Sequence, residues 1–138
     1  MTAVRDLMTL DPVKLKSTEP VSLAASRMRD EGIGTVMVVD DATLRGIVTD
    51  RDITVRIVAE GMDPDEVSVG DLCSTDVHAL SPSDSLADAI RTMNEHALRR
   101  IPVVEDQAPV GVLSLGDLAV ERDPESVLGA ISAAPPNA

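Results

Sequence analysis

The sequence predicts an α/β fold of the α+β kind, made of two tandem copies of one β-α-β-β-α unit. The first observation is an internal repeat, since residues 4–55 align without a gap with residues 69–120. The second is that apolar positions keep register between the copies, so that Met28 falls on Met93. A repeat of this length sets the architecture of a chain. It also predicts two related sites with a pseudo-twofold relation between them.

Each copy is expected to open with a short helical turn, at residues 4–8 and 69–73. A short strand follows, in which alternate positions are directed to one buried face. These positions are Val13 and Leu15 in the first copy, and His78 and Leu80 in the second.

A helix comes next in each copy, because apolar residues recur at the i, i+3, i+4, i+7 spacing of one buried stripe. Thr18 and Ser83 are the expected N-caps, and Gly32 is the expected C-terminal stop of the first helix. The stripes consist of Val21, Ala24, Ala25 and Met28, and of Leu86, Ala89, Ile90 and Met93.

Two apolar runs around an acidic turn then predict a β-hairpin in each copy. A second helix is expected directly after each hairpin, over about residues 50–60 and about residues 115–121. The hairpin runs are 35–39 with 46–48 in the first copy, and 101–104 with 111–113 in the second.

The chain is therefore expected to divide into repeat 1 (1–60), a linker (61–68), repeat 2 (69–122) and a C-terminal tail (123–138). One copy alone would bury too small a fraction of its surface to be stable. The copies are thus expected to pack as one module with a shared core. Residues 133–138 contain two adjacent prolines and are expected to be frayed.

The net charge of −12, from 24 acidic and 12 basic residues, argues against nucleic acid or an anionic membrane as the main partner. A small phosphate ligand stays compatible with this charge because it needs only a few local donors. The absence of Phe, Tyr and Trp predicts an aliphatic core. With no signal peptide and no apolar run long enough to cross a bilayer, the expected location is the cytoplasm.

Neither a metal site nor a catalytic constellation is expected. Cys73 is the single cysteine and falls on Met8, which favours a packing role. His78 and His96 lack ligand spacing with Cys73, so zinc binding is not indicated. The sequence has no recognisable Ser/His/Asp or Cys/His signature, and the chain is not expected to be an enzyme.

The most informative local pattern is the junction between each hairpin and its second helix, which we call the corner. It spans residues 46–53 in the first copy and 111–118 in the second. Both corners contain a glycine, two apolar residues, Thr or Ser, two variable residues, Asp and an apolar residue. This pattern is typical of a capping box, in which the hydroxyl accepts from backbone N–H groups at a helix N-terminus that favours the acid.

A second interpretation uses the same geometry to bind a ligand. The N-terminus of a helix that follows a strand presents N–H groups to an anion. The hydroxyl of Thr49 or Ser114 would donate to a phosphate or sugar oxygen. The carboxylate of Asp52 or Asp117 would accept from both ribose hydroxyls, and Arg51 would meet the phosphates. The two interpretations are compatible, because a side chain can cap in the empty state and rotate toward a ligand.

The β-α-β-β-α repeat resembles the CBS domain, and the tandem resembles a CBS pair, or Bateman module, over about residues 4–120. The Asp-Arg-Asp-Ile corner and the Ala-Glu-Gly-Met-Asp-Pro linker are also similar to those of small stand-alone CBS-pair proteins of actinobacteria, which suggests a stress role. The stretches that carry the resemblance are 28–34 with 38–40, 46–53, 100–105, and 111–114 with 117–118.

The resemblance implies a non-catalytic regulatory module that binds an adenosyl ligand in clefts between the repeats. The implied ligands are AMP, ADP, ATP, S-adenosylmethionine and NAD, with Mg²⁺ accompanying ATP and no cofactor required. The implied assembly is a homodimer formed through helices, with output through self-association or an unknown protein partner. The implied site residues are Thr49, Arg51, Asp52, Ser114, Asp117 and Arg100, with adenine beside Val13, Met37 and Val38 or beside His78, Pro102 and Val103.

The copies differ at the residues that would choose a ligand. Arg51 gives the first corner a charge where the second has Gly116. The second corner is therefore expected to be poorer for phosphates, unless Arg99 or Arg100 reaches across, and unequal sites are predicted. In compensation, the second copy carries the family's apolar-Pro-Val strand at residues 101–103.

The alternative function is a ligand-free structural or adaptor dimer that acts through protein–protein contacts. In that case the capping boxes only cap. Ligand binding separates the two interpretations, and an enzymatic function rests on no feature of the sequence.

Overall fold

The computed structural model describes residues 2–123 and 127–134. The chain forms two compact units, which we call unit 1 (within residues 1–11 and 78–138) and unit 2 (residues 12–77). Neither unit coincides with a sequence repeat, because each takes its opening segment from the other copy. The buried apolar residues form two clusters, one in each unit. The shared core expected for the two copies stays a prediction.

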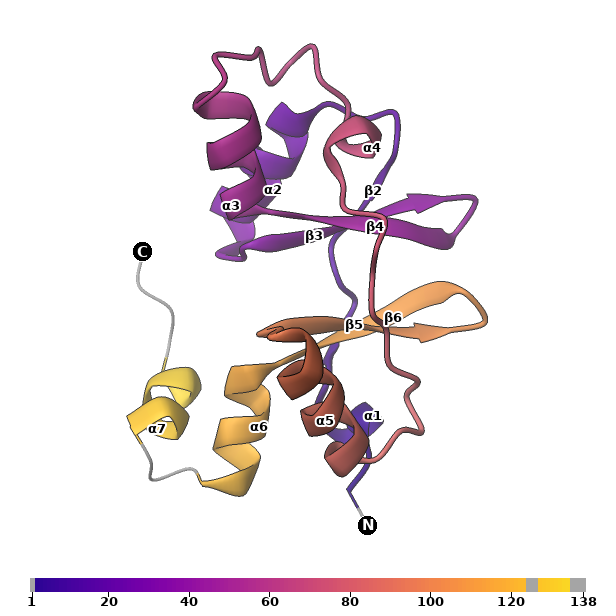
Figure 1. The fold of residues 1–138 in the computed structure, drawn as a ribbon, viewed down its shortest axis with the longest axis vertical. Helices are drawn as coiled ribbons and strands as arrows, with labels where there is room; N and C mark the ends of the chain where they lie inside the picture. Colours follow the sequence, from indigo (N-terminus) through magenta and orange to yellow (C-terminus); the bar gives the residue numbers. More distant parts are fainter. Residues whose placement is uncertain (1, 124–126, 135–138) are drawn as a thin grey trace. The chain divides into compact units, whose positions relative to one another are not determined.

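Unit 2 contains a three-stranded sheet and the helices of the first copy. Its elements are β2 (Lys14–Lys16), α2 (Val21–Glu31), β3 (Thr35–Asp40), β4 (Thr43–Thr49), α3 (Asp50–Ile53), the π-helix η1 (Thr54–Val58) and α4 (Val69–Leu72). The strand order is β2-β3-β4, with β2 parallel and β4 antiparallel to β3. Figure 1 shows α2 and α3 on the same side of the β3–β4 hairpin. The hydrophobic core lies under these helices.

Unit 1 repeats this plan with the second copy. Its elements are α1 (Val4–Leu7), β1 (Thr9–Leu10), α5 (Leu86–His96), β5 (Arg100–Glu105), β6 (Ala108–Ser114), α6 (Leu115–Arg122) and α7 (Val127–Ala133). The strand order is β1-β6-β5, and both pairings are antiparallel. The strand expected at His78 and Leu80 is reduced to a single parallel bridge between Leu80 and Val103. That bridge keeps the register that joins Leu15 to Val38 in unit 2.

The predicted N-caps Thr18 and Ser83 are wrong by two residues, since α2 follows Pro20 and α5 follows Ser85. The reason is that a turn closed by an acidic side chain precedes each helix. Lys16 N donates to Glu19 Oε2 (3.0 Å) before α2, and the equivalent turn before α5 is closed in the same way by Asp84.

The predicted helix stripes are confirmed except at one position each. Ala25 of α2 is exposed, and Ile90 of α5 is 40% exposed. The other stripe residues are buried in their units. The C-terminal stop at Gly32 is confirmed by its left-handed backbone conformation (φ 64°).

A helix lies where the sequence predicted only a tail. α7 packs beside α6 in unit 1, as Figure 1 shows. Most of the stretch expected to be frayed, residues 135–138, lies outside the described residues. The tail from residue 123 onward therefore includes at least one ordered element, which belongs to neither copy of the repeat.

The glycine that opens each corner allows a backbone contact with the exchanged opening segment. A Cβ atom on Gly46 would lie 2.3 Å from the carbonyl oxygen of Ser74, and Ile47 forms an antiparallel bridge to the same residue. A Cβ atom on Gly111 would lie 2.9 Å from the carbonyl oxygen of Thr9, which pairs with β6 in the sheet of unit 1. The glycine at each corner is thus required for packing.

Replacement of Gly46 by alanine is expected to destabilise the protein by about 2 kcal/mol, because the methyl group overlaps a backbone oxygen and the packed segment must move. Urea unfolding followed by circular dichroism measures the effect. Thr43→Ala, on the exposed end of the same strand, is the matched control and should change stability by less than about 0.5 kcal/mol. Equal stability of the two variants would contradict the close contact.

A buried serine holds the acidic end of β3. The hydroxyl of Ser17, which is 8% exposed, donates to Asp40 Oδ1, and Arg45 Nη1 lies 3.1 Å from Asp40 Oδ2. The hydrogen bond from Ser17, with a smaller contribution from Arg45, lowers the pKa of the Asp40 carboxyl below its ordinary value.

Because the pKa of Asp40 is lowered in the folded state, the ionised carboxyl stabilises the fold above its unfolded-state pKa of about 3.9. This contribution is lost as the pH falls through the folded-state value. Ser17→Ala should raise the pKa of Asp40 toward its ordinary value, which an NMR titration of the carboxyl carbon measures. Ser26→Ala, on the helix α2, is the control, and an unchanged Asp40 titration in both variants would disprove the role of Ser17.

Candidate functional site

Both corners form reciprocal capping boxes. In unit 2, Thr49 Oγ1 accepts from the backbone N–H of Asp52 (3.1 Å), and Asp52 Oδ2 accepts from the backbone N–H of Thr49 (2.8 Å). In unit 1, Ser114 Oγ and Asp117 Oδ2 exchange the same two bonds at 3.0 and 2.9 Å. The predicted capping boxes are therefore confirmed. All four residues are half-buried.

The caps leave chemical capacity for a ligand. Each hydroxyl oxygen acts as an acceptor in the cap, so its own hydrogen can be donated outward. Each carboxylate has two oxygens and about four lone-pair sites, and the reciprocal bond uses one of them. The structural role and a binding role are thus compatible at the same residues.

The helices that follow the corners differ. α3 contains only four residues before it passes into the π-helix η1, whereas α6 is a regular helix of eight residues. π-helical turns are rare and often occur at functional sites. Arg51 is exposed on the first turn of α3, where its backbone N–H donates to Asp50 Oδ1 (2.9 Å). The first corner therefore carries its positive charge on an exposed side chain.

A pocket of about 570 Å³ lies at the corner of unit 1. Its cationic wall comes from the start of β5, because the antiparallel register places Arg100 opposite Ser114. The preceding residue, Arg99, accepts a hydrogen bond at its carbonyl from the backbone N–H of Leu115 (2.7 Å). The lining residues are Arg99, Arg100, Ser114, Leu115, Gly116, Asp117 and Ser132.

This pocket decides between the two alternatives that the sequence left open for the second corner. Arg99 and Arg100 do reach the corner, in place of the charge that Arg51 gives the first. In the first copy the equivalent positions are Gly34 and Thr35. The two corners therefore obtain their cations from different elements, a helix in unit 2 and a strand in unit 1.

The residues predicted beside adenine lie in or next to the sheets. Val38 and Val103 are fully buried members of the two cores, and Val13 packs partly buried against the core of unit 2. Met37 and Pro102 are buried neighbours on the same strands, and side chains alternate between the faces of a strand. A contact of any of these residues with adenine stays a prediction.

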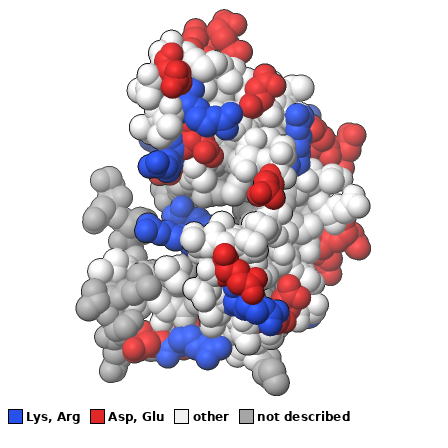
Figure 2. Space-filling view, in the orientation of Figure 1, with Lys and Arg blue, Asp and Glu red and all other residues white. Residues whose placement is uncertain are grey.

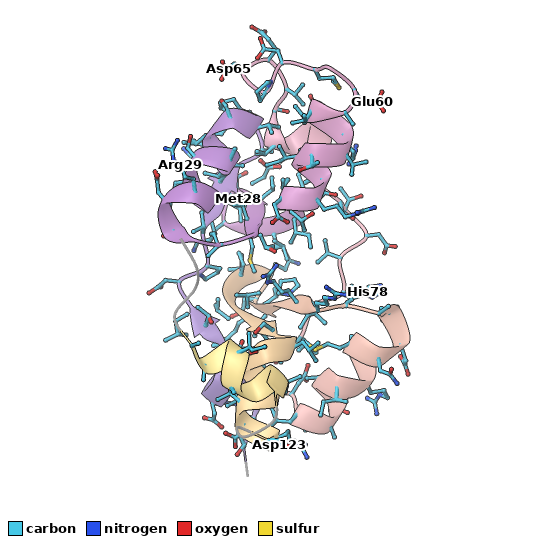
Figure 3. All side chains as sticks on the ribbon, turned by 90° about the vertical axis from the view of Figure 1, so that its left-hand side faces the viewer. Met28, Arg29, Glu60, Asp65, His78 and Asp123 are labelled. Atoms are coloured by element: carbon cyan, nitrogen blue, oxygen red, sulfur yellow. The ribbon has the colours of Figure 1, made fainter. Side chains whose placement is uncertain are left out.

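His78 stacks on His96, a contact that the sequence did not indicate. The ring centroids are 3.6 Å apart and the ring planes differ by 16°; Figure 3 labels His78. Two nearly parallel rings do not direct their in-plane nitrogen lone pairs at one ion. Among the residues that the structure describes, no group of three or more His, Cys, Asp or Glu side chains could hold a metal ion.

Cys73 belongs to the hydrophobic core of unit 2, as its alignment with Met8 predicts. Burial is the largest cause that raises the pKa of its thiol. The thiol is therefore protonated at neutral pH, and Cys73 acts as a small apolar residue.

Charged side chains of both signs are mixed over the face that Figure 2 shows. On the face in Figure 2, Lys and Arg side chains lie among Asp and Glu side chains and form no broad basic area. Surface ion pairs, such as Arg27 with Glu31 (2.8 Å), join nearby residues of opposite charge. Within the described ranges, no helix is long and apolar enough to cross a membrane.

The fold and the two corners define a tandem CBS pair, and the chain belongs to the CBS domain family. The sequence profile of the CBS domain matches residues 4–59 and 69–122. The family and the predicted α/β class with two copies of one unit are thereby confirmed. The chain is a regulatory module of the CBS-pair type.

Two curated relatives match over most of their length. CBS domain-containing protein YhcV of Bacillus subtilis is 37% identical over 122 residues, which cover 88% of this chain and 86% of YhcV. Hypoxic response protein 1 of Mycobacterium tuberculosis is 32% identical over 120 residues, covering 86% and 84% of the two chains. The crystal structure of Hypoxic Response Protein I with two coordinated zinc ions has a TM-score of 0.78, with 32% identity, over 88% of this chain and 99% of that chain.

Removal of a cap hydroxyl by Ser114→Ala or Thr49→Ala is expected to destabilise the protein by about 1 kcal/mol, because the hydroxyl oxygen no longer accepts from the backbone N–H of Asp117 or Asp52 at the helix N-terminus. Ser114→Thr keeps the hydroxyl and should retain most of the stability. Ser83→Ala is the control, since Ser83 is exposed and caps no helix. Urea unfolding measures all four variants, and a Ser114→Ala protein as stable as Ser83→Ala would contradict the cap.

Proposed function

We propose that this CBS pair senses an adenine nucleotide or a related adenosyl ligand, which binds at the corners. The observation that carries the proposal is the pocket of unit 1, where two guanidinium groups, a hydroxyl and a carboxylate line one cavity of about 570 Å³. Small-molecule sites commonly have volumes of about 300–1,000 Å³. The pocket therefore has the size and the donors that a nucleotide needs.

Each polar group of this pocket matches one part of a nucleotide. Arg99 and Arg100 can bind phosphate oxygens with planar, two-pronged donors. The hydroxyl of Ser114 donates to a further oxygen. The carboxylate of Asp117 accepts from the two ribose hydroxyls, as acidic residues do in dinucleotide folds.

The two corners are proposed to bind with unequal affinity. In unit 1 two arginines, Arg99 and Arg100, line one pocket with Ser114 and Asp117, whereas the first corner has the single cation Arg51. Two guanidinium groups offer a phosphate more charge-assisted hydrogen bonds than one guanidinium group does. We therefore propose that the stronger phosphate site is at the second corner, which reverses the order that the sequence alone suggested.

The charge of the whole protein narrows the ligand further. A net charge of −12 disfavours a highly charged free anion at long range. AMP, or ATP neutralised by Mg²⁺, is therefore favoured over free ATP. S-adenosylmethionine and NAD remain in the candidate set because each contains the same adenosyl group.

We also propose that the protein self-associates through the helices of unit 1. An apolar groove of about 500 Å³ runs between α5 and α6, and the large side chains of Ile90 and Leu115 are 40% and 41% exposed beside it. Exposed apolar patches of this kind mark protein–protein contacts. A homodimer would cover the groove, and a protein partner is the other means of passing on the signal.

We propose no zinc site for this chain. The related Hypoxic Response Protein I was crystallised with two coordinated zinc ions, but the stacked pair His78 and His96 does not have the geometry of a shared metal ligand set. The name of that relative supports a stress-related role for the present chain.

Addition of the right ligand at about 100 times its dissociation constant should stabilise the protein by roughly 2.7 kcal/mol. Melting curves with AMP, ADP, ATP, S-adenosylmethionine and NAD, each with and without Mg²⁺, identify it. The chain contains no Trp, Tyr or Phe, so calorimetry or far-ultraviolet circular dichroism is the readout.

Asp117→Asn should weaken the ligand about tenfold while Asp52→Asn has a smaller effect, since each asparagine still accepts the capping bond but loses the charge. The absence of any melting shift at millimolar ligand would refute the sensor and leave the adaptor dimer. A larger loss in Asp52→Asn would place the stronger site in unit 2.

A further inference from the structure

The helix α7 lies beyond both copies of the repeat. The profile of the CBS domain ends at residue 122, and α7 begins at Val127. It packs beside α6 of the same unit. In the first copy the corresponding stretch of sequence is the linker that precedes the second copy. α7 is therefore an element of unit 1 that has no equivalent in the repeat.

A glycine in the corner of unit 1 accommodates this helix. A Cβ atom on Gly116 would lie 2.7 Å from Ser132 Oγ and 3.0 Å from Ser132 Cβ, which is closer than such atoms normally approach. The same Cβ would lie 3.6 Å from Ser114 Oγ. The small residue therefore lets one side chain of α7 approach the corner, and the two serine hydroxyls flank it.

The pocket at this corner consequently holds donors from three separate elements. Arg100 begins β5 and Arg99 directly precedes it, Ser114 ends β6, and Ser132 lies in α7. A phosphate group has several acceptor oxygens and is bound by groups that donate. The arginines and both hydroxyls are such groups.

We infer that α7 is part of the ligand site of unit 1, and that Ser132 is a specificity-determining contact for the phosphate of the ligand. The inference rests on the proposed nucleotide function. It assigns Ser132 to the phosphate, which a nucleotide has and its nucleoside lacks. Gly116 occupies the position that corresponds to Arg51 in the first copy. A long side chain at this position would displace α7. Unit 1 thus exchanges one exposed cation for an additional hydroxyl donor.

Isothermal titration of AMP and of adenosine against three variants of the full chain tests the role of Ser132. Ser132→Ala should weaken AMP by about 3- to 10-fold, as expected for one lost hydrogen bond. Ser132→Asp should weaken AMP further, because a carboxylate repels the phosphate. Adenosine affinity should stay unchanged in both. Ala130→Asp is the matched control, since Ala130 is an exposed residue of α7 that does not line the pocket.

Equal AMP affinities for Ser132→Asp and Ala130→Asp would overturn the inference, and so would equal losses of AMP and adenosine in Ser132→Ala. If the wild-type protein binds neither ligand, the nucleotide function is refuted. A titration with inorganic phosphate then tests whether the pocket binds an anion at all. Chemical-shift changes at the amides of Gly116 and Ser132 that disappear in Ser132→Asp would support the anion site. Their absence, or shifts spread over surface arginines, would overturn it.

Discussion

The contact between the corner glycine of each hairpin and the opening segment of the other copy is the constraint on which both units depend. At Gly46 the backbone of Ser74 and the Sγ atom of Cys73 come so close that no side chain fits. At Gly111 the carbonyl oxygen of Thr9 in β1 also lies too close for a side chain, and β1 extends the sheet by pairing with β6. The buried side chains of the exchanged segments, Val4 in unit 1 and Val69 in unit 2, then complete the two cores.

The same glycine begins the stretch that ends in the capping box, so packing and chemistry are joined over a few residues. The hairpin ends with Thr49 or Ser114 at a helix N-terminus, where the backbone N–H of Asp52 or Asp117 donates to the hydroxyl oxygen and fixes that side chain. A group that is held by its own fold loses little entropy when a ligand arrives. The structural and the binding interpretation of the corner therefore support each other.

The sequence predicts well what depends on local pattern, and less well what depends on contacts distant along the chain. Apolar spacing places the hairpins and the helices, and the motif places the capping boxes. The exchange of opening segments has no signature, because an alignment of two copies does not say which copy packs against which. The hairpin turns also lack one, since Ala42 and Gln107 adopt left-handed conformations (φ 68° in both) without the usual Asn-Gly pair.

In the candidate site, too, the features set by local pattern could be predicted and those set by contacts distant along the chain could not. The cross-strand position of Arg100 beside Ser114 follows from hairpin register and could be anticipated. The approach of Ser132 could not, because it depends on how a helix outside the repeat packs. The apolar residues of that helix have helical spacing, but the adjacent prolines at 135 and 136 favour an irregular tail.

The exchange of opening segments also bears on how such a chain could arise by duplication. In a single ancestral copy, the opening turn would have packed either within its own chain or against an identical second chain. Here the turn of each copy completes the unit of the other, as in a domain-swapped dimer whose two chains have been fused. A fragment cut at the linker would therefore hold one unit without its opening segment and the opening segment of a unit that is absent. Each fragment therefore needs the other fragment to complete its unit, and the two fragments are expected to associate with each other.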